Sequence, residues 1–386
     1  SDAGDLTLQD VQAQGVGSVS INTRGQGLTM VNTNFAGSGN FEIPQGAASH
    51  PTAATMGSGA YFIKGAALDF GGNVNIGSSL DGKTGQYALS SIRDGSITAA
   101  GTINIEGTGP GTAAGDQPTL FNLTLSAGGD INVLSQNQYD MSYTSGGKVS
   151  IHGDSMYRLN IEANTGGPLS SLTDMASWRG NVDVAATFVD GLSVDAVNAV
   201  VVRGSNVGMN GVKPLTEVFN ADITAANITI VGGSGMGSGD VATIADAHLT
   251  ATGVKVNGSN YQGNIDLSTK ALHNSEVAAT GDFAAVNIHS QEALIVQGVR
   301  VNSKDYQGAG VGLSTPLGDI QATGGEAGNV TIRSAGPMTV VGTVAMGQSV
   351  EVLSGDRLVL ANSGLYASRE GTDYTTNSGA ANLRVT

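Results

Sequence analysis

Cysteine is absent from this chain of 386 residues. Its absence excludes a disulfide framework, a cysteine nucleophile, and zinc or iron–sulfur sites built on thiolates. Charged residues are also scarce, at 13% of the chain, about half the usual share. Aromatic residues make up 5%, so a core built around large rings is not expected. The surface must therefore be made polar by Asn, Ser, Thr, Gln and Gly, as on a solvated β-sheet.

Clusters of positive charge and long apolar runs are missing as well. The net charge is −15 and Lys and Arg form no run, so we expect no binding to nucleic acid. No stretch of about 18 residues is apolar enough for a membrane-spanning helix. The first residues contain neither a basic nor an apolar signal region, so the chain is either cytoplasmic or a processed or excised piece, and the composition favours the second interpretation.

Short strands separated by glycine and polar turns recur along the whole chain, which contains 58 Gly. In each unit two apolar residues flank an outward residue, and this period of two predicts a strand with one buried face. Many units also have a preceding short strand and a corner of small residues, as at 97–101. This recurrence predicts an all-β, right-handed parallel β-helix that forms one shaft over residues 1–386. A propeller and an antiparallel sandwich explain the recurring unit less well.

An internal repeat and three interruptions refine this prediction. Residues 253–263 match residues 298–308, which we interpret as two turns of roughly 20 residues, or on the order of 16 to 19 turns in all. The pattern breaks near residues 35–60, 107–118 and 135–179, which we predict to be loop excursions.

Alternation also predicts which side chains face the core. We expect Val254, Val256, Ile265, Leu267, Val286, Ile288, Val330, Ile332, Val350 and Val352 to point inward, and Asn75, Asn104, Asn132, Lys255, Asp266 and Glu351 to point outward.

Residues 126–135 resemble the repeats of filamentous haemagglutinin-like exoproteins of bacterial two-partner secretion, and residues 97–106 and 328–334 fit the same pattern. The resemblance implies a β-helical adhesin shaft, export through an outer-membrane secretion partner, and a secreted or cell-surface location. It also implies work in adhesion, biofilm or toxin display. The Asn-Pro-rich motifs of that family's secretion domain are not seen, so the resemblance extends to the shaft alone.

Right-handed β-helices also include polysaccharide lyases and hydrolases, so catalysis has to be considered. The Asn-Thr-Asp, Asp-Asp, Gly-His-Gly and Arg-Ile-Lys motifs of pectin hydrolases do not occur in this sequence. His152 with Asp154 is more typical of a turn after a strand than of a general base. The five histidines have no metal-ligand spacing, and the glycine run at 232–237 lacks the Lys of a phosphate loop. We therefore predict no catalytic residue, no metal site and no cofactor.

One set of aromatic residues is a candidate ligand site. Tyr139, Tyr143, Tyr157 and Trp178 fall in the third predicted excursion, and exposed rings on a loop can bind sugars. The alternative is that these rings only cap a small cluster of the loop itself. Tyr261 and Tyr306, at matching positions of the repeat, are expected to be stacked structural rings.

Three functions stay open at this point. The first is a structural or adhesive shaft whose partner is a host or bacterial surface glycan, a protein receptor, or another copy of itself. The second is a polysaccharide-degrading β-helix enzyme or a tailspike. The third is a subunit of a self-assembling extracellular filament, because open strand edges can template stacking. We favour the shaft, which would not be an enzyme.

Overall fold

The structure is a computed structural model, and its regular elements are β-strands. No helix in the part that it describes is long and apolar enough to span a membrane. Contacts divide the chain into two compact units, which are described separately below. Unit 1 comprises Ser1–Gly166, Val182–Ala186 and Ser205–Lys213, and unit 2 comprises Gly167–Asn181, Thr187–Gly204 and Pro214–Thr386. The described residues are 6–21, 28–43, 61–77, 89–106, 119–163, 180–205, 213–234, 239–253, 255–256, 259–260, 263–279, 285–303, 329–342, 344–347, 349–367 and 382–385.

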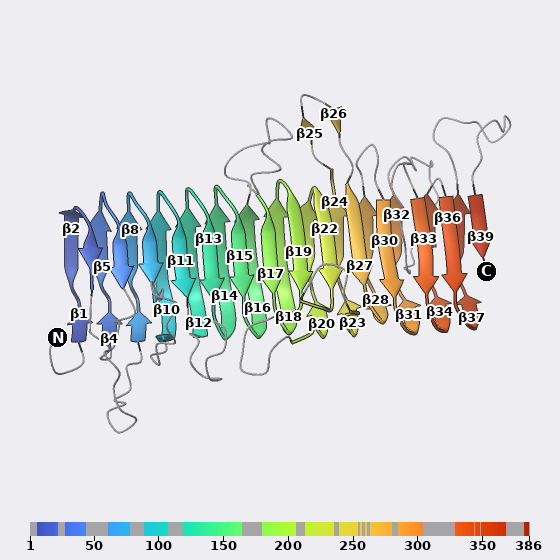
Figure 1. Ribbon diagram of the computed structural model, residues 1–386, viewed down its shortest axis with the longest axis horizontal. Helices are drawn as coiled ribbons and strands as arrows, with labels where there is room; N and C mark the ends of the chain where they lie inside the picture. Colours follow the sequence, from blue (N-terminus) through green and yellow to red (C-terminus); the bar gives the residue numbers. More distant parts are fainter. Residues whose placement is uncertain are drawn as a thin grey trace, which may run out of the picture. The chain divides into compact units, whose positions relative to one another are not determined.

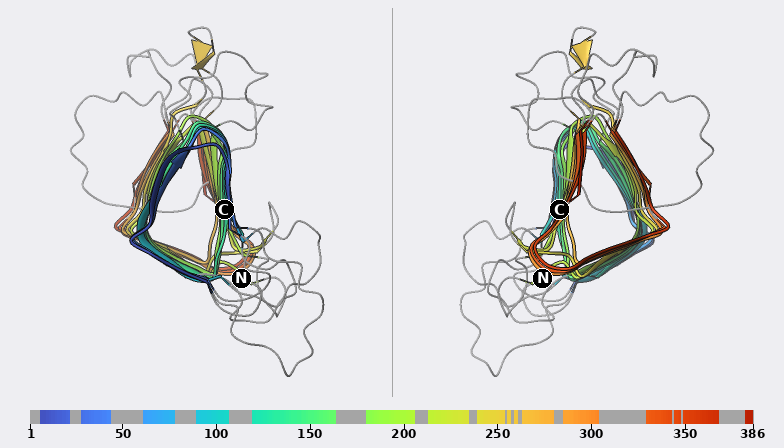
Figure 2. Two further views of the ribbon diagram at one scale, coloured as in Figure 1. Left: turned by 90° about the vertical axis from the view of Figure 1, so that its left-hand side faces the viewer. Right: turned by 90° about the vertical axis from the view of Figure 1, so that its right-hand side faces the viewer.

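Unit 1 is a right-handed parallel β-helix whose turns have three sides (Figures 1 and 2). Every strand pairs in parallel with the equivalent strand of the next turn, as Ile103 of one turn pairs with Ile131 of the next. We call the sides the first, second and third face, in chain order. The first face begins with β1 (Leu6–Gln9), β4 (Leu28–Val31) and β7 (Tyr61–Lys64), and the second with β2 (Gln12–Val16), β5 (Asn34–Gly37) and β8 (Ala67–Phe70). Four longer strands then cover both faces: β10 (Leu89–Ala99), β12 (Thr119–Ala127), β14 (Asn137–Ser145) and β16 (Ser155–Ala163). The third face contains β3 (Val19–Ser20), β6 (Phe41–Ile43), β9 (Val74–Ile76), β11 (Ile103–Glu106), β13 (Ile131–Leu134), β15 (Val149–His152) and β17 (Val182–Ala185).

Unit 2 has the same three-sided architecture, again with parallel pairing between turns. An antiparallel pair, β25 (Lys255–Val256) with β26 (Ser259–Asn260), leaves the coil at one of its turns. Strand β18 (Phe188–Ala196) covers the first and second faces. The first face continues with β20 (Glu217–Phe219), β23 (Thr243–Ala245), β28 (Ala271–His273), β31 (Leu294–Gln297), β34 (Met338–Val341) and β37 (Leu358–Ala361), and the second with β21 (Asp222–Ala225), β24 (His248–Ala251), β29 (Glu276–Ala279), β32 (Arg300–Ser303), β35 (Val344–Gly347) and β38 (Gly364–Ala367). The third face contains β19 (Ala199–Arg203), β22 (Asn227–Val231), β27 (Asn264–Ser268), β30 (Ala285–Ser290), β33 (Asn329–Ser334), β36 (Ser349–Ser354) and β39 (Asn382–Val385).

A single left-handed residue forms the corner between the first and second faces. The chain makes this corner without a separate turn. Strand β12, for example, runs from the first face to the second through Asn122, which has a φ of 51°. Glycine, Asn and Asp tolerate this conformation best, because other side chains clash with their own backbone. In unit 1 the corner residues are Asp10, Asn32, Gly65, Asp94, Asn122, Asp140 and Arg158.

Alternating side chains from the three faces fill the core, and the predicted orientation is confirmed wherever the structure describes it. The third face supplies six of the predicted inward residues, each with none of its surface exposed: Ile265, Leu267, Val286, Ile288, Val350 and Val352. The predicted outward residues Asn75, Asn104, Asn132, Asp266 and Glu351 are partly exposed. The amide of Asn104 donates to Oδ1 of Asn75 at 2.7 Å, and Asn132 donates to Asn104 at 2.8 Å, so the outward asparagines form a ladder. The side chains of Val254, Val330, Ile332 and Lys255 lie outside the described residues.

Two of the predicted excursions begin too early. Residues 35–43 belong to β5 and β6, and residues 137–163 form β14, β15 and β16, which are part of the regular coil. In that region residues 18 positions apart stack on each other, as Asn137 stacks on Ser155. Strands β14 and β16 escaped prediction because Tyr, Gln and Arg interrupt their apolar pattern, whereas 148–151 carries the recurring strand unit. Residues 44–60, 107–118 and 164–179 of the predicted excursions lie outside the described residues.

The 45-residue repeat does not correspond to whole turns of the coil. Arg300–Ser303 is a second-face strand that pairs with β29, whereas the matching Lys255 and Val256 lie in the antiparallel pair outside the coil. The side chain of Val256 lies outside the described residues, so its predicted inward orientation stays a prediction. The number of turns was also overestimated, because the structure describes seven third-face strands in each unit. Turns that carry long insertions use more residues than the estimate allowed.

Candidate functional site

The first face of unit 1 presents a column of large side chains, one from each turn. The column occupies the position just before each left-handed corner. Register places Lys64 beside Arg93, Arg93 beside Phe121, and Phe121 beside Tyr139, which in turn lies beside Tyr157. We call Lys64 and Arg93 the cationic rungs, and Phe121, Tyr139 and Tyr157 the aromatic rungs.

The aromatic rungs contact one another. The rings of Tyr139 and Tyr157 are stacked, with centroids 5.1 Å apart and planes 5° apart, and Phe121 packs against Tyr139 at 6.3 Å with its ring tilted. The guanidinium of Arg93 lies 5.7 Å from the centroid of Phe121, within the range of a cation–π contact. Each tyrosine therefore covers one face of its neighbour, and both side chains stay partly exposed to solvent.

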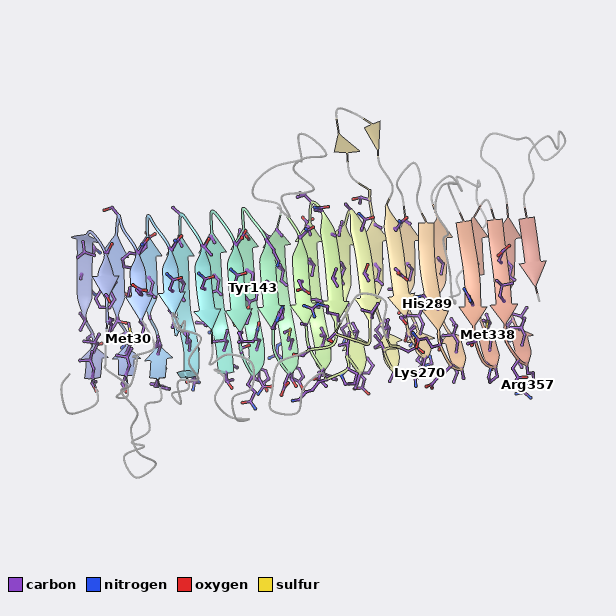
Figure 3. The ribbon with its side chains drawn as sticks, viewed as in Figure 1. Met30, Tyr143, Lys270, His289, Met338 and Arg357 are labelled. Atoms are coloured by element: carbon purple, nitrogen blue, oxygen red, sulfur yellow. The ribbon has the colours of Figure 1, made fainter. Side chains whose placement is uncertain are left out.

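The four residues predicted as a sugar site do not form one site. The structure brings Tyr139 and Tyr157 together, but it buries Tyr143 completely in the core of unit 1 (Figure 3). Its hydroxyl donates to Oε1 of Gln138 at 2.5 Å, and Nε2 of Gln138 donates to Oγ of Ser135 at 2.8 Å. Burial raises the pKa of the Tyr143 phenol above its ordinary range. Trp178 lies outside the described residues, as do Tyr261 and Tyr306.

Hydrogen bonds join the corner residues beside the column in pairs. Asn32 donates to Asp10 at 3.1 Å, and Asn122 donates to Asp94 at the same distance. Arg158 binds both carboxylate oxygens of Asp140, at 2.5 and 2.8 Å. The hydrogen bond from Arg158 lowers the pKa of Asp140. Protein donors thus already bind the corner carboxylates.

The first face of unit 1 carries no carboxylate at its described outward positions. The column just before the corner contains Gln9, Val31, the cationic rungs and the aromatic rungs, and the parallel column contains Thr7, Thr29, Phe62, Ser91, Thr119, Asn137 and Ser155. The second and third faces differ, because outward carboxylates occur there at Asp69, Glu162, Glu42 and Asp183.

His152 lies near a hydroxyl and a carboxylate on the third face of unit 1. Its Nε2 is 3.4 Å from Oγ of Ser150 and 3.4 Å from Oδ2 of Asp183. A serine–histidine–aspartate relay needs the two ring nitrogens to contact different partners, and here one nitrogen contacts both. Asp154, the partner considered from sequence, instead binds Nζ of Lys213 at 2.7 Å. This cluster cannot activate Ser150 as a nucleophile by that relay.

Unit 2 contains two further polar clusters. The carboxylate of Asp240 accepts hydrogen bonds from the hydroxyls of Ser268 and Ser290 and from the backbone of Gln291, at 2.7 to 2.9 Å. On the second face, Glu276 lies between His248 at 3.7 Å and Arg300 at 3.6 Å. In the described ranges no three His, Asp or Glu side chains are placed to hold a metal ion.

Sequence reasoning missed Phe121 and the cationic rungs as members of one column. A signal was present, because each rung lies between a buried apolar or polar residue and a corner-forming one, as in Ile63–Lys64–Gly65. The insertions between turns concealed this spacing, since the corners recur at unequal intervals.

Comparison with family models, with curated proteins and with solved structures found no match. The fold and the site geometry are therefore the observations available for assigning a function.

Proposed function

We propose that this chain is a structural and adhesive shaft of a secreted or cell-surface bacterial protein. The observation that carries the proposal is the unbroken parallel stacking within each unit, in which consecutive third-face strands pair without interruption. Each turn satisfies the backbone of its neighbour and adds a layer to one core, as in solenoids that act as extended supports.

Polar outward ladders support this role. Hydrogen bonds join the outward asparagines to one another, and other hydrogen bonds join the corner residues in pairs. Both sets place hydrogen-bonding groups along surfaces that water or a partner can reach. A rigid scaffold with repeated surface groups suits contacts with another surface at many points. The resemblance of residues 126–135 to filamentous haemagglutinin-like repeats supports export through an outer-membrane secretion partner.

The adhesive part is tested with the purified chain attached to beads. Beads that carry the chain should retain bacterial cells or surfaces coated with extracellular polysaccharide, and beads that carry a heat-unfolded sample should not. Equal retention by folded and unfolded chain would contradict an adhesive surface, because unfolding destroys every column but preserves composition.

The main competitor is a polysaccharide-degrading enzyme of the same fold. Incubation with a panel of bacterial and plant polysaccharides should release no new reducing ends or unsaturated products. Turnover of any member of the panel would replace the shaft with a β-helix enzyme.

A further inference from the structure

We propose that the first face of unit 1 binds an acidic polysaccharide that lies along the stack of turns. Uronate carboxylates would contact the cationic rungs, and sugar hydroxyls would contact the edges of Tyr139 and Tyr157. This inference deepens the adhesive part of the proposed function by naming a partner class for one face.

Charge is the first argument. Lys64 is exposed, and its ammonium group has no ion pair or hydrogen bond to another described residue, while Asp94 contacts Arg93 at Nε, at 3.4 Å. The described outward positions of this face hold no carboxylate, although the chain as a whole has a net charge of −15. An acidic polymer is therefore repelled less here than by the other faces of unit 1, and it meets two adjacent cations.

The state of the corner carboxylates is the second argument. Asp94 accepts from Asn122 at 3.1 Å, and Asp140 is bound at both oxygens by Arg158. Because these protein donors already bind them, the carboxylates next to the column repel an approaching anion less than bare carboxylates would.

Geometry is the third argument. Successive rungs of the column belong to successive turns, so the groups repeat about every 4.8 Å along the stack. A polysaccharide also presents its hydroxyls and carboxylates at regular intervals along an extended chain. Tyr139 and Tyr157 are both partly exposed, and Phe121, with 38% of its surface exposed, adds an apolar patch between the cationic rungs and the tyrosines. The result is an open strip suited to a polymer, not an enclosed site for a small molecule.

The experiment measures binding of size-defined polygalacturonate oligosaccharides to the purified full chain by isothermal titration calorimetry. The double variant Lys64→Gln/Arg93→Gln should bind at least about tenfold more weakly, as expected when charge-assisted hydrogen bonds are lost. The matched control is Lys148→Gln/Arg357→Gln, which changes the net charge equally at residues that do not belong to this face. Arg357 is an exposed residue of unit 2 (Figure 3). The control should bind within about twofold of the original chain.

A second pair of variants tests the tyrosine edges. Tyr139→Phe/Tyr157→Phe keeps the stacked rings but removes both of their hydroxyls. It should therefore weaken polygalacturonate binding with little change in the free energy of unfolding. Tyr143→Phe removes a buried hydroxyl and should lower stability while leaving affinity unchanged.

The outcomes separate this inference from the proposed function. Failure to bind polygalacturonate, equal binding of its fully methyl-esterified form, or equal loss in the control double variant would overturn the inference. If beads carrying the chain still adhere while polygalacturonate does not bind, only the partner class is wrong. If the beads also fail to adhere, both the partner class and the adhesive function are wrong.

Discussion

At the scale of single residues, the core of unit 1 contains a polar network inside apolar surroundings. Ser135, Gln138 and Tyr143 have no exposed surface, and two hydrogen bonds link them. Buried polar groups are tolerated when each finds a partner, and they are costly when one partner is removed. The network explains how a tyrosine can occupy an inward position in a strand whose other inward residues are smaller.

Tyr143→Phe should therefore destabilise unit 1 by about 1–3 kcal/mol, because Oε1 of Gln138 loses its donor. The effect should also depend on pH. Since burial raises the pKa of the Tyr143 phenol, its contribution is fully present below the pKa of an unfolded tyrosine and is lost as the pH rises above that value. Urea unfolding at neutral and alkaline pH checks both points. A gap between variant and original that did not shrink at alkaline pH would contradict the ionisation argument.

Val350 and Glu351 test the inward–outward alternation at adjacent positions. Val350 has no exposed surface, while Glu351 is partly exposed on the outer side of β36. Val350→Asp should cost at least about 3 kcal/mol, because it buries a carboxylate without a partner. Glu351→Ala should change stability by less than about 0.5 kcal/mol, as is usual for surface positions. Chemical unfolding of both variants provides the comparison, and similar midpoints would contradict the alternation.

At the scale of elements, corners determine where one face ends and the next begins. The first corner depends on one left-handed residue per turn, and the corner before the third face depends on backbones that approach closely. These two requirements explain why Asn, Asp and Gly recur at the corners. They also mean that corner residues cannot be exchanged for good strand formers.

Asn122 provides the test of the first corner. Asn122→Val should destabilise by about 1–2 kcal/mol, because a β-branched residue resists a φ of 51°. Asn122→Gly, which accepts that conformation, should lose only the hydrogen bond to Asp94 and should cost less. Thermal unfolding of the two variants checks the order, and a valine variant as stable as the glycine variant would refute the conformational requirement.

Gly128 provides the test of the other corner. A Cβ added there would collide with the carbonyl oxygen of Ala100 in the preceding turn, whereas a Cβ at Gly17 would meet no atom within 4 Å. Gly128→Ala should therefore cost about 1–3 kcal/mol through overpacking, and Gly17→Ala should cost little. Denaturant midpoints of the two variants measure the difference. Equal midpoints would show that the turns can move apart without cost.

At the scale of the whole molecule, stability is distributed over neighbouring turns. A turn contacts the turns on either side of it, so each unit resembles a one-dimensional array in which layers can be added or removed. Charge is distributed unevenly over such an array: in unit 1 the described outward carboxylates avoid the first face. In the function that we propose, the array is the scaffold and the columns on it provide the binding groups.

Deletion of residues 128–145 should leave a folded protein. These residues form one complete turn, because partners in this region are 18 positions apart, and the deletion removes Gln138 and Tyr143 together. Circular dichroism should show the same β-sheet signal and a cooperative transition. Deletion of residues 137–145 alone removes half a turn and should abolish that transition, because the following strands then lie on the wrong face. A half-turn deletion as stable as the full-turn deletion would contradict the repeating register.

Local pattern determined much of this protein. Alternation in 264–268 or 349–352 specifies a strand and its buried side without reference to the rest of the chain, because a strand's side chains alternate whatever it pairs with. The parallel β-helix followed from the recurrence of strand, small-residue corner and strand. Absence of cysteine and the scarcity of charge also excluded whole classes of site before any fold was known.

Only the tertiary structure decided which residues share a column. Phe121, Tyr139 and Tyr157 become neighbours because their turns stack in register, whereas Tyr143, four residues from Tyr139, faces the core. The same holds for the repeat at 253–263, whose two copies occupy different positions in the coil. Register between turns depends on how many residues each insertion removes from the coil, and local sequence does not record that number.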